Sequence, residues 1–309
     1  MPRFLVTGGA GFIGSHLCER LLGGKNNVIA VDNLSTGTLA NLDSLKKEPR
    51  FEFIRGDVAE KIPDVGKVDG VLHFASPASP WDFVPLAIEI LKVGSLGTFH
   101  AIEYAHKHGA WFFMASTSEV YGDPKEHPQK ETYLGNVSTT GVRSVYDESK
   151  RFSEAVTAAY RRKHKLPVSI VRIFNTYGPR MRPNDGRVVP NFISQALQGE
   201  PITIYGDGSQ TRSFCYVDDL VDGLVRFVDK RPSDPINLGN DRETSIREIA
   251  ETIVRLCNSK SGFVSEPFPE GDPKLRCPDL TRAKKILGWS PKTSLEAGLR
   301  KTIDYFRIA

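Results

Sequence analysis

The sequence is poor in the residues that form covalent or metal cross-links. Its four cysteines are far apart and include no CxxC pair. This spacing argues against a disulfide framework and against a zinc site, and it suits a reducing compartment. The close histidine pair, His106 and His108, falls at the polar end of a predicted helix, where solvated side chains are the simpler interpretation. We therefore expect neither disulfide bonds nor a metal centre.

Long apolar runs and a strong charge of one sign are also missing. No stretch of about 18 apolar residues occurs, so we expect no transmembrane helix. The first predicted strand begins at Arg3 and leaves no room for a signal peptide, so we expect a cytoplasmic protein. The formal net charge of +4 is too small to indicate nucleic-acid binding, but it suits an anionic small substrate.

What the first part of the chain does contain is a regular alternation of strand-like and helix-like segments. Strands are predicted at 3–8, 27–32, 51–57, 70–76, 111–116 and 167–175, and helices at 11–24, 86–108 and 146–164. Such an alternation predicts a parallel sheet covered by helices on both faces. The fold class is therefore α/β, with a doubly wound, Rossmann-type sheet.

After Asn175 the pattern changes to a loop-like stretch rich in proline, glycine and arginine, followed by short elements without βαβ order. We expect two pieces to return to the first sheet: a strand and helix at about 213–229, and "PINLGN" (235–240). The Rossmann domain then comprises 1–175 plus about 213–241. A smaller α/β lobe comprises about 176–212 plus 242–309, with helices at about 280–287 and 294–307. The cleft between the two is the natural place for a substrate.

The segment "TGGAGFIG" (7–14) joins the first predicted strand to the first helix and places Gly8, Gly11 and Gly14 in a GxxGxxG pattern. Such glycines allow a tight turn and a close approach of backbone to a pyrophosphate, which the helix amino terminus then binds. Asp32 ends the second strand, where an acidic residue binds a ribose diol and repels the extra phosphate of NADP. The pattern therefore predicts NAD as the cofactor.

A second carboxylate, Asp57, follows the third predicted strand. It either hydrogen-bonds the adenine or caps the strand end. The predicted cofactor contacts are Gly8, Gly11, Phe12, Ile13, Gly14, Asp32, Asn33, Asp57, Val58, Tyr146 and Lys150.

The stretch "YDESK" (146–150) places Tyr146 and Lys150 on one face at the start of a long helix. A neighbouring ammonium favours the phenolate, so that the tyrosine can take a proton from a sugar hydroxyl. Thr117 and Glu119 follow the buried run "WFFMAS" and lie on one side of an extended segment. Open α/β sheets place their chemistry at such carboxyl ends of strands.

Taken together, "TGGAGFIG", "ASTSEVYGDP" and "YDESK" resemble the extended short-chain dehydrogenase/reductase family. The longer stretches "LKVGSLGT", "RIFNTYGPRMRPNDGRVVPNF", "YGDGSQTRSFCYVDDLVDGL" and "GDPKLRCPDLTRAKKILGW" resemble its UDP-glucuronate decarboxylase branch, over nearly the whole chain. Trp81, Phe83 and Leu134 depart from that branch's pattern.

This resemblance implies an NAD-dependent enzyme that converts UDP-glucuronate to UDP-xylose through a 4-keto intermediate, with the NADH recycled internally. It implies that Thr117 polarises the sugar hydroxyl, that Tyr146 is the base, and that Lys150 holds the nicotinamide ribose. The implied catalytic set is Thr117, Glu119, Tyr146, Lys150 and Arg276. The implied substrate contacts are Ser118, Glu119, Asn175, Arg187, Tyr205, Gln210, Arg212 and Arg276.

Several alternatives remain open. Arg187, like Arg180 and Arg182 in the same stretch, is either a substrate contact or a solvated surface residue. The enzyme could instead be a UDP-sugar 4-epimerase or a nucleotide-sugar 4,6-dehydratase, although Ser118 stands where dehydratases carry an acid. A catalytically idle NAD-sensing or scaffold protein is an alternative of another class. The family also implies a homodimer built from the helices near 86–108 and 146–164.

Overall fold

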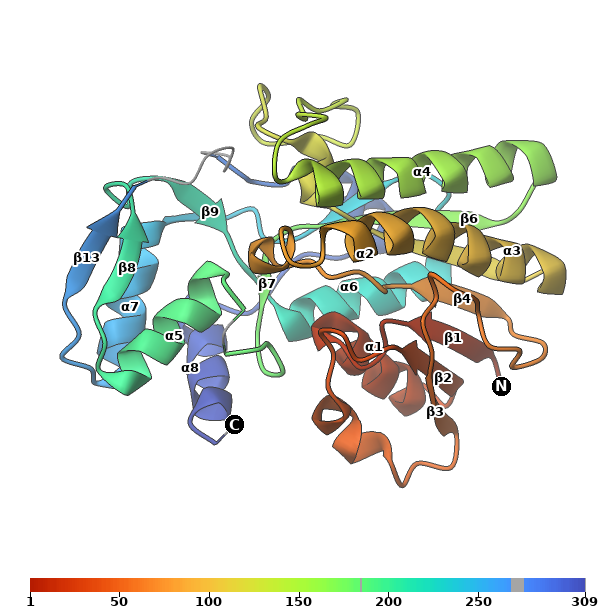
Figure 1. The fold of residues 1–309 in the computed structure, drawn as a ribbon, viewed down its shortest axis with the longest axis horizontal. Coiled ribbons are helices and arrows are strands. Elements are labelled where there is room, and N and C mark those ends of the chain that lie inside the picture. The colour runs from red at the N-terminus through yellow and green to blue at the C-terminus, as the bar shows by residue number, and fades with distance from the viewer. Residues whose placement is uncertain (184, 268–274, 309) are drawn as a thin grey trace.

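The computed structural model describes residues 1–183, 185–267 and 275–308, so "GDPK" (271–274) in the resemblance lies outside the described residues. A seven-stranded sheet, in the order β11-β6-β5-β4-β1-β2-β3, forms the centre of the larger lobe (Figure 1). All of its neighbouring strands are parallel. Its strands are β1 (Arg3–Thr7), β2 (Asn27–Asp32), β3 (Phe51–Arg55), β4 (Gly70–His73), β5 (Trp111–Thr117), β6 (Val168–Ile173) and β11 (Ile236–Leu238).

Successive side chains of each strand point to opposite sides, and those of the central strands β1, β4 and β5 are buried on both faces by helices. In β1, Phe4 and Val6 pack with α1 and α6, whereas Leu5 packs with α3 and α4. Figure 1 shows these two helix layers on either side of the strands. The doubly wound α/β fold is therefore confirmed, and the strand order reverses between β1 and β4.

The helices follow the predicted order. The α-helices are α1 (Phe12–Gly23), α2 (Ala87–Lys92), α3 (Thr98–His108), α4 (Ser144–His164), α5 (Val188–Gln198), α6 (Val217–Lys230), α7 (Ile246–Cys257) and α8 (Leu295–Phe306). Shorter turns are η1 (Leu39–Leu45), η2 (Pro80–Asp82), η3 (Val93–Gly97), η4 (Ser118–Tyr121) and η5 (Ala283–Leu287). Within the described ranges, no helix is long and apolar enough to cross a membrane.

The second lobe has its own apolar core, built mainly from α5, α7 and α8. It lies at the left in Figure 1, beyond the end of the sheet. Three two-stranded pairs accompany these helices: β7 (Thr176–Tyr177) with β10 (Cys215–Tyr216), β9 (Thr211–Ser213) with β12 (Glu243–Ser245), and β8 (Ile202–Tyr205) with β13 (Phe263–Glu266).

Two details differ from the expected organisation. The strand expected to return to the main sheet near 213 is only two residues long, and β10 pairs with β7 instead. At this edge of the main sheet β11 pairs with β6, as predicted for "PINLGN". The helix that follows β10, α6, packs against α1. The expected helix 86–108 is continuous but contains the π-helical turn η3. Gly94 lies in that turn, and a Cβ there would come 2.5 Å from Ser149 Cβ, so the glycine allows α4 to approach closely.

We predict that Gly14→Ala destabilises the fold while Gly23→Ala, on the same helix α1, does not. A Cβ on Gly14 would lie 2.1 Å from the carbonyl oxygen of Gly8, so α1 would have to move away from the glycine turn. A Cβ on Gly23 meets no atom within 4 Å. Urea unfolding should show a loss of about 2 kcal/mol for Gly14→Ala. Gly23→Ala should change stability by less than about 1 kcal/mol. Equal losses in the two variants would contradict the close contact.

Candidate active site

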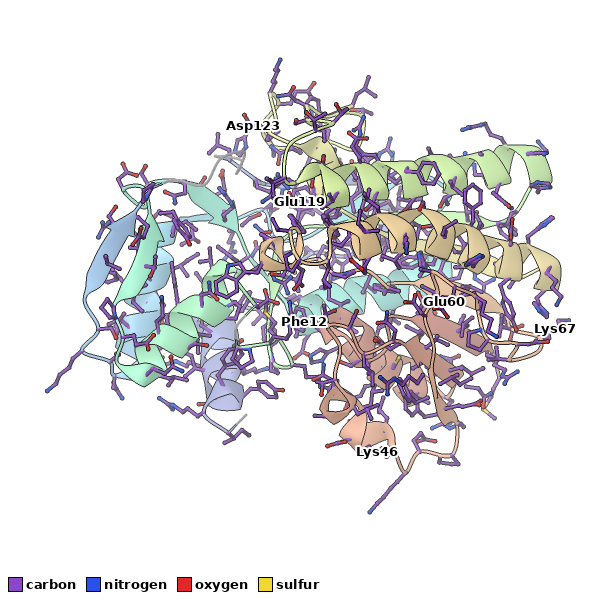
Figure 2. The ribbon with its side chains drawn as sticks, in the orientation of Figure 1. Phe12, Lys46, Glu60, Lys67, Glu119 and Asp123 are labelled. Atoms are coloured by element: carbon purple, nitrogen blue, oxygen red, sulfur yellow. The ribbon has the colours of Figure 1, made fainter. Side chains whose placement is uncertain are left out.

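One cavity of about 1450 Å³ is lined by residues of both lobes. It brings together all the candidate residues of the sequence: Gly8, Gly11, Phe12, Ile13, Gly14, Asp32, Asn33, Asp57, Val58, Thr117, Ser118, Glu119, Tyr146, Lys150, Asn175, Arg187, Tyr205, Gln210, Arg212 and Arg276. Phe12, which begins α1, and Glu119, which follows β5, are labelled near the middle of the molecule in Figure 2. The roles of these residues remain predictions; their convergence is a structural fact.

The glycine turn after β1 forms one wall of this cavity. Gly8 adopts a φ of 71°, which favours glycine, and its carbonyl oxygen accepts the N–H of Gly11 at 3.2 Å. A Cβ on Gly8 would lie 2.7 Å from the backbone nitrogen of Ala75. Gly11 caps α1 without a side-chain hydrogen bond, so no side chain covers the first turn of the helix there. This cradle suits a pyrophosphate at the helix amino terminus.

Asp32 stands at the end of β2 beside the same turn. Its Oδ2 accepts the N–H of Ala10 at 3.0 Å and its Oδ1 accepts the N–H of Leu34 at 2.8 Å. Burial raises the pKa of Asp32, and these backbone donors partly offset that effect. The carboxylate is thus held in a fixed position at the carboxyl end of β2, which is where a contact to a ribose diol is expected.

Asp57 has the capping role that was one of its two interpretations. Its Oδ1 accepts the N–H of Ala59 at 2.8 Å, and its Oδ2 accepts Asn33 Nδ2 at 3.0 Å. The side chain also lines the cavity, next to Val58. The cap and an adenine contact are therefore compatible in this geometry.

The predicted catalytic residues converge at the end of β5 and the start of α4. Thr117 is the last residue of β5, and its hydroxyl hydrogen-bonds Tyr146. One turn along α4, Lys150 Nζ donates to the carbonyl of Ala115 at 3.0 Å and lies 5.8 Å from the Tyr146 ring centroid. The spacing in "YDESK" therefore places both side chains on the face of α4 that meets β5.

Burial sets the protonation of this pair. Burial raises the pKa of Tyr146, and the hydrogen bond from Thr117 acts in the opposite direction. Burial also lowers the pKa of Lys150 to about 8, and the Glu154 carboxylate opposes that shift. Lys150 is thus still mostly charged at neutral pH, but it is close enough to its titration to respond to a further positive charge beside it.

Glu119, in η4, is held between two guanidinium groups. Arg276 Nη1 donates to Oε1 at 2.6 Å, and Arg143 Nη2 donates to Oε2 at 2.5 Å. Burial alone would raise the pKa of Glu119, but the positive charges of Arg276, Arg143 and Arg212 outweigh it and lower the pKa to about 2. Glu119 is therefore an anion at every physiological pH and accepts hydrogen bonds.

Arg276 is 1% exposed, so it forms part of the floor beneath the cavity. Besides binding Glu119, its Nη1 donates to Ser118 Oγ at 3.1 Å and its Nη2 donates to the carbonyl of Gly122 at 2.8 Å. The buried Ser118 hydroxyl thus has a direct partner in the guanidinium. This arginine fixes the whole turn after β5.

The remaining candidates line the same cavity: Asn175 comes from the end of the first domain, and Tyr205, Gln210 and Arg212 come from the second lobe. Arg212 lies on β9 and is largely buried, and its Nη1 donates to the carbonyl of Thr211 at 2.9 Å. Gln210 Nε2 donates to the carbonyl of Tyr205, whose ring is exposed at the end of β8. Asn175 accepts the N–H of Cys215 on its carbonyl, which leaves its side chain on the cavity wall.

The three arginines of the 180–187 stretch are all ion-paired, and all line the cavity. The pairs are Arg180 with Glu19 at 2.6 Å, Arg182 with Asp82 at 2.6 Å, and Arg187 with Asp185. Neither simple interpretation from the sequence describes them fully, since each is anchored by a carboxylate and also faces the cavity.

The sequence missed one contributor to the site, Arg143, and indicated a second, Phe83, only as a departure from the family pattern. Arg143 precedes α4, where a positive charge is unfavourable for the helix dipole, and this misfit was the available signal that a nearby carboxylate holds it. Phe83 departs from the family pattern, and its ring stacks on Tyr146 with centroids 5.3 Å apart. The guanidinium of Arg143 lies over the Phe83 ring, with its Cζ 5.6 Å from the ring centroid.

Residues 5–302 match the family model described as GDP-mannose 4,6 dehydratase. UDP-glucuronic acid decarboxylase 5 of Arabidopsis thaliana is 48% identical over 307 residues, which are 99% of this chain and 89% of that protein. UDP-glucuronic acid decarboxylase 1 of Danio rerio is 48% identical over 304 residues, 98% of this chain and 72% of that protein.

Two solved structures are similar over 99% of both chains. UDP-glucose 4-epimerase of Thermotoga maritima, solved with UDP-glucose, has a TM-score of 0.91 at 32% identity. UDP-glucuronic acid 4-epimerase of Bacillus cereus, in complex with UDP-glucuronic acid and NAD, has a TM-score of 0.89 at 30% identity. Fold, cofactor turn and relatives agree. The chain belongs to the extended short-chain dehydrogenase/reductase family, in its UDP-glucuronic acid decarboxylase branch.

Proposed function

We propose that the protein is an NAD-dependent decarboxylase that converts UDP-glucuronate to UDP-xylose through a 4-keto intermediate. The observation that carries this proposal is Glu119, a permanent anion held between two guanidinium groups, beside the Thr117–Tyr146–Lys150 set. The relatives at 48% identity are named for this reaction, whereas the solved epimerases are 30–32% identical.

The reaction needs oxidation at carbon 4 of the sugar ring. Tyr146 accepts the proton of the carbon 4 hydroxyl, and Thr117 holds that hydroxyl in place. NAD, when bound, supplies the acceptor for the hydride of carbon 4 and gives it back at the end, so no external reductant is consumed. Lys150 holds the nicotinamide ribose, and its ammonium favours the phenolate form of Tyr146. The glycine turn and Asp32 hold the pyrophosphate and the adenosine ribose.

A ketone at carbon 4 is beta to the carboxyl group on carbon 5. The bond between carbon 5 and the carboxyl carbon then breaks and carbon dioxide leaves. The electron pair of that bond moves toward the ketone at carbon 4 and forms an enolate. A proton from solvent must next reach carbon 5. Because the pKa of Glu119 is about 2, this side chain cannot store that proton at neutral pH. Its role is to accept hydrogen bonds, which orients the ring hydroxyls and a water beside carbon 5.

Ser118 and Arg276 distinguish this site from that of a dehydratase. Elimination of water needs an acid for the leaving hydroxyl, and here that position holds a buried serine bonded to Arg276. An epimerase needs no charged clamp next to the threonine, so the double ion pair at Glu119 favours decarboxylation. A catalytically idle NAD sensor would not require Thr117, Tyr146 and Lys150 to converge on one cavity.

We infer that the substrate's nucleotide lies mainly against the second lobe. We infer that Arg212 and Asn175 bind the pyrophosphate, and that Tyr205 and Gln210 lie near the base, because all four line the same cavity as the catalytic set. The positive charge of Arg187 opposes the rise that burial causes in the pKa of Tyr146, and we infer from this that Arg187 serves the sugar end. The division into an NAD-binding domain (1–175 plus about 213–241) and a sugar-nucleotide lobe (about 176–212 plus 242–309) is part of this proposal.

We further propose that the protein works as a homodimer in the cytoplasm. Four free thiols suit a reducing compartment. Exposed apolar side chains on α2, η3 and α4 support a partner surface, which we call the helix patch: Ile88, Leu91, Leu96 and Phe152.

The reaction predicts a specific isotope pattern. When the reaction is run in heavy water, UDP-glucuronate should be converted to carbon dioxide and UDP-xylose. The UDP-xylose should carry one deuterium at carbon 5 and its original hydrogen at carbon 4. Mass and proton spectra of the product measure both positions. The deuterium arises because the enolate takes its proton from a group that exchanges with solvent.

Each alternative gives another product. A 4-epimerase would incorporate no carbon-bound deuterium, and a 4,6-dehydratase would give a six-carbon sugar without release of carbon dioxide. A six-carbon product, or a pentose without deuterium at carbon 5, would exclude the decarboxylation described here and the role of Glu119 in it.

Tyr146→Phe should abolish turnover and leave NAD binding intact, because only the phenol oxygen is lost and the ring still stacks on Phe83. We expect at least about a thousandfold loss of kcat, which is within the range for a proton-transfer residue. Tyr160→Phe on the same helix is the control, since that hydroxyl binds Glu103 at the exposed end of α4. More than a few per cent residual activity in Tyr146→Phe would remove Tyr146 as the base.

Light scattering should give a mass twice that of the chain. The double change Leu96→Asp and Phe152→Asp places charges in the helix patch, so it should shift the protein towards the monomer. Val264→Asp, at a partly exposed apolar position on β13, is the matched control and should leave the mass unchanged. A dimer that persists unchanged in the double variant would place the interface elsewhere.

A further inference from the structure

A second carboxyl group lies beside the catalytic set and has no role in the mechanism above. Asp147 follows Tyr146 on α4 and is 5% exposed. Its backbone N–H donates to the carbonyl of Arg143 at 3.0 Å. Its Oδ1 is buried and accepts no hydrogen bond from the described residues. Burial of this oxygen without a donor disfavours the ionised form of the side chain, because that oxygen lacks the hydrogen bonds that water would supply.

The charges around Asp147 come from three elements. Arg143, Lys150 and Arg151 share its face of α4, at a spacing of three or four residues. From η4 comes the Glu119 carboxylate, and from the segment after 275 comes the Arg276 guanidinium. Burial and the negative charge of Glu119 raise the pKa of Asp147 to about 7, while Arg143 and Arg276 oppose the shift and Glu148 adds slightly to it.

Glu119 and Asp147 therefore face the same two arginines. With Asp147 neutral, Arg143 Nη2 donates to Glu119 Oε2, and Glu119 keeps both of its guanidinium partners. Arg143 lies four residues before Asp147, a spacing at which an arginine and an ionised aspartate on one helix attract each other. When Asp147 is ionised, its carboxylate competes with Glu119 for the guanidinium of Arg143. It also adds a second negative charge near Glu119.

We propose that Asp147 is a positioning residue for Glu119: its neutral form leaves Arg143 on Glu119, and its ionised form draws Arg143 away and loosens the clamp at the sugar. Because Asp147 does not line the cavity, it acts only through Arg143 and Glu119. The proposal rests on the decarboxylation proposed above for its kinetic readout. Its structural readout is independent of that function.

The sign of the pH dependence follows from the two carboxyls. Glu119 stays ionised throughout the neutral range, so it contributes no titration there. Asp147 loses its proton as the pH rises through about 7, and the clamp should loosen over that range. Lys150, with a pKa of about 8, gives a second decline at higher pH. Activity should therefore fall in two steps on the alkaline side.

Asp147→Asn keeps the size and neutrality of the side chain but removes its ionisation. Rates of UDP-xylose formation between pH 5.5 and 9 should show that the first alkaline step, near pH 7, disappears in this variant, and that the step near pH 8 remains. The ratio of kcat at pH 8 to kcat at pH 6 should rise about tenfold over the wild type. Glu148→Gln is the matched control, because it removes a carboxylate one residue away that pairs with Arg151 and not with Arg143.

Arg143→Gln tests the same idea from the other partner. Without Arg143 there is no guanidinium for ionised Asp147 to draw away from Glu119, so the first step should disappear from the pH profile of kcat while Asp147 is still present. A step that stays at pH 7 in either Asp147→Asn or Arg143→Gln overturns the proposal. So does an Asp147→Asn protein that binds UDP but is inactive at pH 6 as well, since Asp147 would then be needed for its own proton.

The structural readout is thermal stability against pH. The folded pKa of Asp147, about 7, is above the ordinary value of 3.8, so its contribution to stability is lost as the pH rises between these values. The Tm advantage of Asp147→Asn over the wild type should therefore grow from pH 4 to pH 7 and stay constant above it. A constant difference overturns the proposal. A growing difference in a protein that forms no UDP-xylose would leave the Asp147 titration standing and reject the decarboxylase function.

Discussion

A buried carboxylate cannot be left without compensating charge, and Glu119 imposes this constraint on the whole site. Its two partners come from distant parts of the chain, Arg143 at the start of α4 and Arg276 in the second lobe. The charge of Glu119 therefore helps to hold the second lobe against the turn after β5. Gln129 reinforces the contact, because its carbonyl, backbone N–H and side chain all bond the segment that follows Arg276.

The same constraint decides what the site can do. A carboxylate with two guanidinium partners accepts hydrogen bonds and does not give up a proton, so the chemistry beside Thr117 must be of a kind that needs an oriented acceptor. Oxidation at carbon 4 and loss of carbon dioxide meet that condition, and elimination of a hydroxyl does not. The sheet supplies only the platform, since epimerases and this chain share it at TM-scores near 0.9.

Local patterns in the sequence were sufficient for the sheet, the glycine turn and the Tyr146–Lys150 pair, because each depends on residues that are near neighbours. The pairing of β10 with β7 could not be foreseen, since two-residue strands carry no periodic signal. The clamp on Glu119 was also invisible: Arg143 is 24 residues away in sequence, and its contact depends on where the turn after β5 meets α4. The burial of Asp147 has the same origin. This residue is 5% exposed in the first turn of α4, and the local pattern "YDESK" carries no signal for that burial.

The distance in sequence between Glu119 and Arg276 has a consequence for how the protein is made. A chain leaves the ribosome amino terminus first, so β1 to β5 are available long before residue 276 is synthesised. Until then the Glu119 carboxylate lacks one of its two counter-charges, and the turn that carries Thr117 and Glu119 keeps its contact with water. The last edge strand, β11, also joins β6 only in this late phase. A nascent chain can therefore build the cofactor half early, while the sugar-binding half becomes ordered only when its carboxy-terminal segment arrives.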